Sequence, residues 1–150
     1  MPTPDPTPDL VTWLRGVFDE VEQTARYVLT DYAEHAASWE HPVTGVVQLG
    51  DELLPTGDGP LAEHIAHHDP AAVLADIAAK RAILDLHSPF THPYDGLVCD
   101  YCNSLCHSRS GLMCDSPDAP YPCDTVRLLA SAYRHHPDFL PEWEPVRSEP

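Results

Sequence analysis

The chain has 150 residues, of which 43% are hydrophobic, and this length fits one domain with a modest core. Its 24 acidic residues against 8 basic ones give a net charge of −16, so direct binding to an anionic nucleic-acid backbone is not expected. The acidity favours solubility, and the alternative is a DNA mimic that binds a basic partner. Because no run of about 18 apolar residues and no secretory signal occurs, we expect a cytoplasmic protein without a membrane span.

The first predicted element is a long amphipathic helix. Residues 1–6 form a disordered lead-in, and Thr7-Pro8 supplies an N-cap followed by proline at the first helical position. From Leu10 to Tyr32, apolar residues recur at steps of three, four and seven, which is typical of a helix with one buried face. We expect this helix to end near Ala37.

A short β-hairpin is predicted next, at about residues 45–54. Val46–Leu49 and Glu52–Leu54 are apolar runs on either side of Gly50-Asp51, a favourable two-residue hairpin turn. The preceding Thr44-Gly45 is a further predicted turn.

Two helices are predicted after the hairpin. The first covers Pro60–His68, and Asp69-Pro70 restarts the chain as N-cap and first helical residue. The second helix runs to about His87 and stops at Ser88-Pro89.

Residues 88–122 show no periodicity, and a loop of that length needs something to replace the missing core. A last helix follows Cys123, ends at His136-Pro137 and leads into a tail with Trp143 as an anchor. We therefore expect an α+β fold, mostly α: three to four helices, a short hairpin and a zinc-stapled C-terminal loop. The helical part (7–87), the Cys-rich loop (88–123) and the final helix with its tail (124–150) form one structural domain in this interpretation.

All five cysteines lie between residues 99 and 123. Cys99 and Cys102 form a C-x2-C pair, a spacing that lets two thiolates of one turn bind one tetrahedral metal at about 2.3 Å. Cys114 and Cys123 complete the preferred set of zinc ligands. Cys123 begins the last helix, where unpaired N–H groups and the helix dipole favour a thiolate.

The sequence leaves the ligand set and the metal open. Cys106 and His107 are alternatives to Cys114, and an iron–sulfur cluster held by four thiolates is the alternative to zinc. Two further interpretations are open. The cysteines could form a thiolate centre that loses its metal on oxidation, or some of them could be buried thiols that act as small apolar residues. Disulfides are not expected in a reducing compartment, and an odd number of cysteines would leave one thiol over.

A second candidate metal site lies on the first short helix. His64 and His68 are four residues apart, so both imidazoles lie on one helix face, as in helical metal sites. The chain lacks the H-E-x-x-H pattern of zinc proteases. The simpler interpretation is that these histidines end a helix near its negative pole.

Several short segments form a recognisable pattern: Glu63–Ala66, His68–Ala71, Pro122-Cys123, Thr125–Ala130 and His136–Asp138. Through these segments the chain resembles an uncharacterised actinobacterial and phage family, the domain of unknown function 6221. The resemblance implies a small cytoplasmic protein with a C-x2-C pair and a later Pro-Cys before the last helix. It implies no activity.

No nucleophile elbow, phosphate-binding loop or dinucleotide fingerprint occurs in the sequence. We therefore expect a non-enzymatic, zinc-binding accessory protein whose acidic surface or long N-terminal helix contacts an unidentified protein partner. The alternatives are a metal-dependent hydrolase that uses His64 and His68, and a thiol-based redox sensor.

Overall fold

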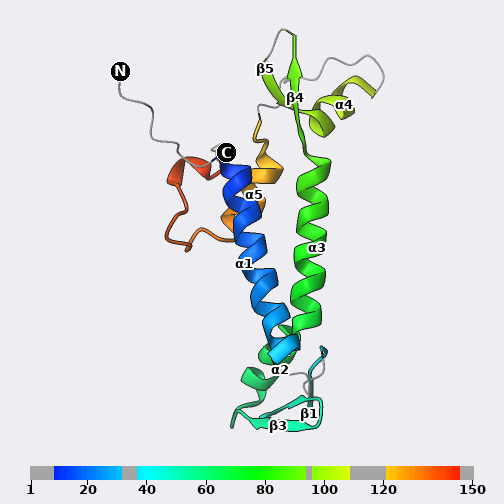
Figure 1. Cartoon of the computed structure of the whole chain (residues 1–150), viewed down its shortest axis with the longest axis vertical. Coiled ribbons are helices and arrows are strands. Elements are labelled where there is room, and N and C mark those ends of the chain that lie inside the picture. The colour runs from blue at the N-terminus through cyan, green and yellow to red at the C-terminus, as the bar shows by residue number, and fades with distance from the viewer. Residues whose placement is uncertain (1–8, 32–36, 94–95, 109–120, 146–150) are drawn as a thin grey trace. The chain divides into compact units, whose positions relative to one another are not determined.

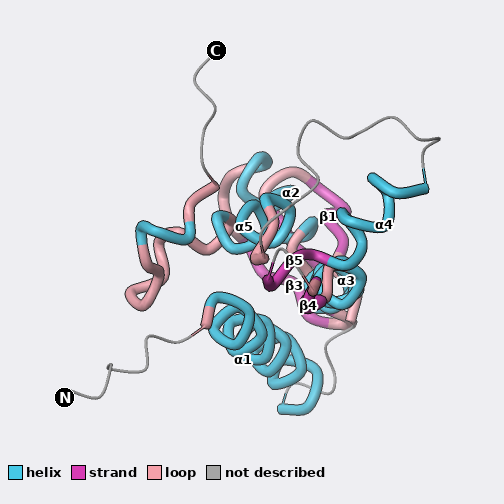
Figure 2. Tube along the Cα trace, turned by 90° about the horizontal axis from the view of Figure 1, so that it is seen from above, coloured by secondary structure: helices cyan, strands magenta, loops and turns pink. Residues whose placement is uncertain are grey.

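The structure is a computed structural model that describes residues 9–31, 37–93, 96–108 and 121–145 (Figures 1 and 2). These residues form five α-helices, five strands and one 3-10 helix, so the expected α+β class is confirmed. The chain divides into two compact units. We call Gly16–Ala79 the sheet unit, and Met1–Arg15 with Lys80–Pro150 the cysteine unit.

Helices α1 (Leu10–Asp31) and α3 (Pro70–Leu86) contribute to both units, because each unit boundary falls inside one of them. The sequence predicted that α1 would extend from Thr7 to about Ala37. Residues 1–8 and 32–36 lie outside the described residues. None of the described helices has the length and apolar character needed to cross a membrane.

The sheet unit contains a three-stranded antiparallel sheet with the order β1-β2-β3, formed by β1 (Glu40–Val43), β2 (Val46–Leu49) and β3 (Glu52–Pro55). The β2–β3 register pairs Leu49 with Glu52, which confirms the predicted hairpin with its turn at Gly50-Asp51. Gly50 has φ 63°, a left-handed conformation that glycine adopts without strain.

Strand β1 was not predicted, because the predicted hairpin begins at about residue 45 and β1 contains Pro42, which cannot donate a backbone hydrogen bond. In the structure β1 pairs with β2 around a turn at Thr44-Gly45, in which Gly45 has φ 76°. A proline is tolerated in an edge strand because its missing N–H faces away from the ladder.

Helix α2 (Gly59–His67) packs against this sheet and forms the local core with it (Figure 1). Val47 and Leu49 of β2 are buried together with Ala62 of α2, and Trp39 and Ile65 pack against them. Successive side chains of β2 point to opposite faces of the sheet, so every second one is buried against α2. A strand of four residues can therefore contribute two side chains to the core.

The predicted N-cap of α3 is confirmed. The Asp69 carboxylate accepts a hydrogen bond from the backbone N–H of Ala72 at 2.6 Å. Its other oxygen accepts from Ser38 Oγ at 3.2 Å and from the Trp39 N–H at 3.1 Å. Asp69 therefore caps the helix and also fastens the segment that leads into β1.

The cysteine unit contains a second hairpin, of β4 (Pro89–His92) and β5 (Gly96–Cys99), followed by α4 (Asp100–Ser108). Residues 88–122 were predicted to lack regular structure, and this prediction is wrong for β4, β5 and α4. Strands of four residues are too short to show a period, and α4 carries few apolar residues. After α4, helix α5 covers Asp124–Ser131.

Helix α5 is shorter than predicted. The sequence placed its end at His136-Pro137, but α5 ends at Ser131 and the chain continues in tighter turns. In these turns Tyr133 N–H donates to the Ala130 carbonyl at 2.9 Å and His136 N–H to the Tyr133 carbonyl at 2.9 Å. Apolar periodicity extends through such turns as well, which explains the difference.

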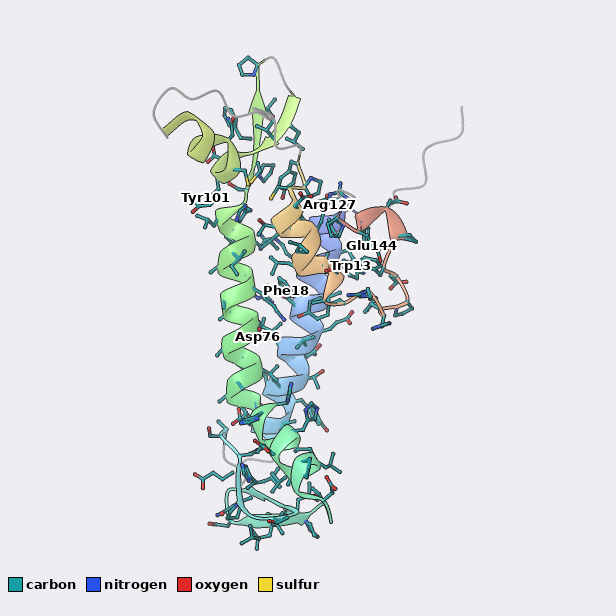
Figure 3. All side chains as sticks on the ribbon, turned by 180° about the vertical axis from the view of Figure 1, so that it is seen from behind. Trp13, Phe18, Asp76, Tyr101, Arg127 and Glu144 are labelled. Atoms are coloured by element: carbon teal, nitrogen blue, oxygen red, sulfur yellow. The ribbon has the colours of Figure 1, made fainter. Side chains whose placement is uncertain are left out.

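The C-terminal tail returns to the start of α1 within the cysteine unit (Figure 3). Trp143, in the 3-10 helix Pro141–Trp143, is buried with its ring centroid 4.8 Å from that of Trp13. The Phe139 ring meets Trp13 edge-on at 5.7 Å. The Arg127 guanidinium of α5 donates to the Glu142 carbonyl at 2.8 Å, which ties the tail to the last helix.

Candidate metal centre

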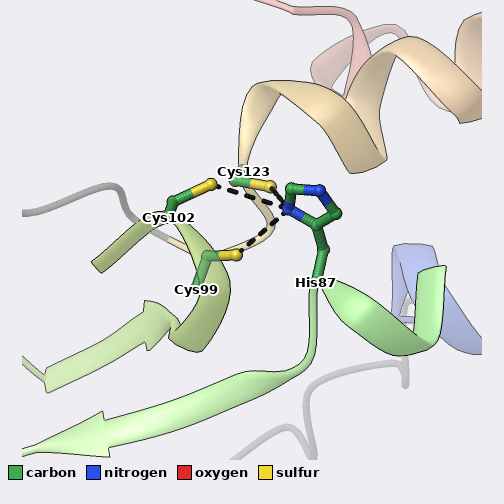
Figure 4. A group of neighbouring side chains, drawn as sticks. All are labelled: His87, Cys99, Cys102 and Cys123. Carbon is green, nitrogen blue, oxygen red and sulfur yellow. Dashed lines mark hydrogen bonds between the residues drawn. The ribbon is translucent and has the colours of Figure 1, made fainter. Parts of the chain in front are cut away.

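Four side chains converge in the cysteine unit, and each comes from a different place in the fold (Figure 4). His87 follows the last residue of α3, and Cys99 is the last residue of β5. Cys102 lies in the first turn of α4, and Cys123 is the N-cap of α5. The C-x2-C pair spans the junction of a strand and a helix, so one turn of chain presents both sulfurs to the same point.

The distances within the group are short and nearly equal. His87 Nδ1 lies 3.4 Å from Cys99 Sγ, 3.6 Å from Cys102 Sγ and 3.4 Å from Cys123 Sγ. All four candidate ligand atoms lie within 4.8 Å of one another. A tetrahedral zinc with bonds of about 2.3 Å to sulfur and about 2.0 Å to nitrogen would set nitrogen and sulfur about 3.5 Å apart.

Hydrogen bonding alone does not account for this arrangement. The Nδ1 atom of a neutral imidazole carries either one hydrogen or one lone pair, so it can serve one sulfur well but not three. The thiol is also a weak donor and a weak acceptor. A cation at the centre would satisfy all four atoms at once.

The site is largely removed from solvent. His87, Cys99 and Cys123 are buried, at 7%, 0% and 4% exposure, and Cys102 is partly buried. The Tyr101 ring meets the His87 ring edge-on at 5.0 Å and covers it on the α4 side. The three cysteines are free thiols.

Burial favours the uncharged forms of His87, Cys99 and Cys102. Burial lowers the pKa of the His87 imidazole below its ordinary 6.5. Burial also raises the pKa of the Cys99 thiol, and it raises the pKa of Cys102 to about 12, with smaller contributions from Cys99 and Cys123. Without a metal, Cys99 and Cys102 therefore hold their thiol protons at neutral pH, and a cation would have to displace these protons.

Backbone hydrogen bonds hold the segments that carry the ligands. Asp100 N–H donates to the Ser88 carbonyl at 3.0 Å, next to His87 and Cys99. Tyr121 N–H donates to the Leu97 carbonyl at 3.1 Å, which brings the residues before Cys123 beside β5.

The structure brings together three of the four cysteines of the preferred set, namely Cys99, Cys102 and Cys123. Cys114 lies outside the described residues. Cys106 and His107 belong to α4, but their side chains are not among those described.

His87 was not predicted as a ligand. In the sequence, His87 marks only the predicted end of the helix that precedes Ser88-Pro89. One signal could have singled it out: a histidine directly before the helix-stopping Ser88-Pro89, ahead of a C-x2-C pair, is well placed to turn back on that pair.

The candidate site at His64 and His68 has a different geometry. The two rings lie 4.4 Å apart, and His68 Nδ1 lies 2.9 Å from the His64 carbonyl oxygen, so His68 caps the end of α2. Among the described residues, no group of three or more ligating side chains includes this pair. The arrangement favours the helix-end interpretation.

Comparison with known proteins gives a family but no activity. No curated protein and no solved structure matches the chain. A family model described as a family of unknown function (DUF6221) matches residues 7–145, which confirms the resemblance seen in the sequence. The chain therefore belongs to the DUF6221 family.

Proposed function

We propose that this chain is a non-enzymatic accessory protein built around a structural zinc site with the ligands His87, Cys99, Cys102 and Cys123. The observation that carries the proposal is the convergence of three sulfurs on one imidazole nitrogen at 3.4–3.6 Å. These separations suit a tetrahedral ion and do not suit a hydrogen-bonded cluster.

The donor set favours zinc among the biological metals. Three thiolates and one imidazole are a common structural zinc set, whereas magnesium and calcium prefer oxygen ligands. Iron–sulfur clusters are usually held by four thiolates, so the imidazole supports zinc over a cluster.

The same donor set supports a structural role over a catalytic one. A catalytic zinc keeps one coordination position open for water or substrate, but here the protein supplies four ligands. The ligands join the end of α3, the junction of β5 and α4, and the start of α5, which are three separate stretches of the sequence. The free energy of metal binding would therefore act as folding free energy for this unit.

An interaction role fits the rest of the molecule. The net charge of −16 would attract a protein with a basic surface. Strand β3 lies at an edge of the described sheet, and its Leu53 and Leu54 are 60% and 45% exposed. A photo-crosslinking amino acid at Leu53 should give a discrete adduct with a basic protein. An adduct-free chain with the crosslinker at Leu53 and at Leu54 would contradict the interaction role.

The metal proposal is tested by elemental analysis of the purified chain together with a thiol count. We expect one zinc per chain. The variants His87→Ala and Cys123→Ser should each lose most of the zinc.

Three matched variants serve as controls. Cys106→Ser, His107→Ala and Cys114→Ser should all keep one zinc per chain. A chain that contains iron or no metal would contradict the proposal. A variant series in which Cys114→Ser abolishes zinc binding and His87→Ala does not would show that the ligand set is wrong.

A further inference from the structure

The three-stranded sheet of the sheet unit has one covered face and one open face. Val47 and Leu49 of β2 are buried on the face that α2 covers (Figure 1). Because successive side chains of a strand alternate between the two faces, Val46 and Gln48 point to the opposite face. We call this opposite face the outer face of the sheet.

The strand register extends the outer face from β2 onto β1 and β3. Directly paired residues of antiparallel strands share a face, so the outer face has two rows of cross-strand partners. One row is Val43, Val46 and Pro55, and the other is Glu40, Gln48 and Leu53. The irregular register between Glu40 and Val43 is a bulge that keeps both residues on this face. The outer face is therefore mainly apolar.

The apolar side chains at the two edges of this face are open to solvent. Val43 of β1 is 59% exposed and Leu53 of β3 is 60% exposed, and Val46 between them is half-buried. Single exposed apolar side chains are common on protein surfaces, but apolar side chains gathered on one sheet face are typical of an interaction surface.

The charges around the outer face select its partner. In the stretch Gly16–Ala79 of the sequence, Arg26 is the only Lys or Arg, whereas acidic residues occur in α1, β1, β3, α2 and α3. Arg26 already pairs with Glu22 of α1 at 2.7 Å. Glu40 lies on the outer face itself, and Asp51 is exposed at the turn between β2 and β3. A second copy of the chain would bring the same negative charge, so a basic partner is favoured.

The dimensions of the outer face suit one helix. Three strands of four residues, about 4.8 Å apart, give a surface of about 10 Å by 13 Å. An α-helix with its side chains is about 10 Å wide. An added strand fits less well, because Pro42 of β1 and Pro55 of β3 have no N–H to donate to a partner strand.

We propose that the outer face binds an amphipathic helix of a basic partner protein. The apolar stripe of that helix packs on Val43, Val46 and Leu53, and Lys or Arg residues beside the stripe lie near Glu40 and Asp51. This inference rests on the interaction role proposed above, and it adds the surface and the chemistry of the partner.

The test titrates the full, zinc-loaded, 15N-labelled chain with a peptide of about 14 residues, roughly 21 Å long as a helix. The peptide carries leucines along one helix face, lysines elsewhere and a side-chain lactam bridge that holds it helical. One control peptide has the same composition with its leucines spread over all faces, and another has glutamate in place of lysine. The basic amphipathic peptide should shift the amide resonances of Val43, Val46 and Leu53 but not that of Leu128 in α5. Both controls should bind at least about tenfold more weakly.

Two pairs of variants separate the apolar contact from the charge. Leu53→Gln should weaken binding of the basic peptide about tenfold, because the burial of a leucine side chain is lost. Leu128→Gln is the matched control, since Leu128 is 59% exposed but lies outside the sheet unit, and it should leave the affinity unchanged. Glu40→Gln should weaken binding about threefold and reduce its salt dependence, whereas Glu63→Gln, at an exposed glutamate of α2, should do neither.

Outer-face resonances that do not move at about 1 mM basic peptide would overturn this inference. Equal binding of the peptide with scattered leucines, or equal losses in Leu53→Gln and Leu128→Gln, would also overturn it, because charge alone would then explain the binding. Dimers of the chain in sedimentation that Leu53→Gln returns to monomers would assign the outer face to a second copy and contradict the inference.

The interaction role can survive the failure of this inference. A failed titration together with a discrete adduct of a basic protein at Leu53 would leave that role standing and reject only the amphipathic helix. If Leu53→Gln fails to fold, as judged by circular dichroism, the comparison of the three peptides still decides the question.

Discussion

The two hairpins of this protein are held in different ways. In the sheet unit, β2 and β3 lie on an apolar core of Val47, Leu49 and Ala62. In the cysteine unit, Phe90 and Leu97 of the β4–β5 hairpin are exposed, at 43% and 51%, and Val98 and Cys99 are buried. Beyond Val98, the second hairpin is therefore anchored where the Cys99 sulfur meets the His87 imidazole, whereas the first hairpin is anchored by aliphatic side chains.

This difference shows how a small chain with a modest core can order a region that is poor in apolar residues. At the proposed zinc site, one ion with four ligands would replace many apolar contacts, because its binding free energy is realised only in the folded arrangement. Perturbing the metal site should therefore leave the hairpin of the sheet unit largely intact, and perturbing the apolar core should leave the hairpin of the cysteine unit largely intact.

Removing zinc should have the largest effect. Chelation, or the variant Cys123→Ser, should lower the thermal midpoint by more than about 10 °C, because structural zinc binding contributes several kcal/mol or more. Hydrogen exchange should become fast in β4, β5, α4 and α5, while β1–β3 and α2 keep their protection. Uniform loss of protection across both units would contradict the separation.

The second-largest loss of stability is expected when a core residue of the first hairpin is shortened. Leu49→Ala should cost about 2–4 kcal/mol, the usual range for a buried leucine. Denaturant unfolding would measure the loss, and elemental analysis should still find one zinc per chain. A variant that loses its zinc would show that the two hairpins are coupled.

A smaller, pH-dependent effect is expected for the metal-free protein. Burial raises the pKa of Cys102 from 9.0 to about 12, so the folded state keeps a proton that the unfolded state releases above pH 9. This stability is fully present below pH 9 and is lost as the pH rises toward 12. Denaturant unfolding at pH 8 to 10 should show the decline with chelator present, and in Cys102→Ser the decline should be weaker. An unchanged free energy of unfolding over this range would contradict the assignment.

The smallest effect is expected for an exposed ion pair of the cysteine unit. Arg15 and Asp85 approach to 2.6 Å, but their side chains are 45% and 61% exposed, so solvent screens them. Arg15→Ala should change the free energy of unfolding by less than about 1 kcal/mol. A larger loss, measured by denaturant unfolding with zinc bound, would mean that charges rather than the metal hold this unit.

The sequence predicted elements that have a strong local signal. Three features depend on a few neighbouring residues, and all three are present in the structure: the amphipathic helix α1, the Gly50-Asp51 turn and the Asp69 cap. Strands β4 and β5 lack such a signal, since each has four residues and no clear alternation of apolar and polar residues. Tertiary pairing, not local preference, forms them.

The candidate metal centre was predictable in part for the same reason. The C-x2-C pair of Cys99 and Cys102 is a local pattern, and Cys123 immediately precedes a predicted helix. His87 joins them only because the β4–β5 hairpin returns the chain to the end of α3. A prediction that omits this hairpin has no means of placing His87 beside the sulfurs.

X-ray absorption at the zinc K-edge of the purified chain tests the central claim most directly. The account predicts three sulfur ligands at about 2.3 Å and one nitrogen at about 2.0 Å. In His87→Ala, any zinc that remains should lose the nitrogen signal. A spectrum with four sulfurs, a shell dominated by oxygen, or no bound zinc in the unmodified chain would contradict the account.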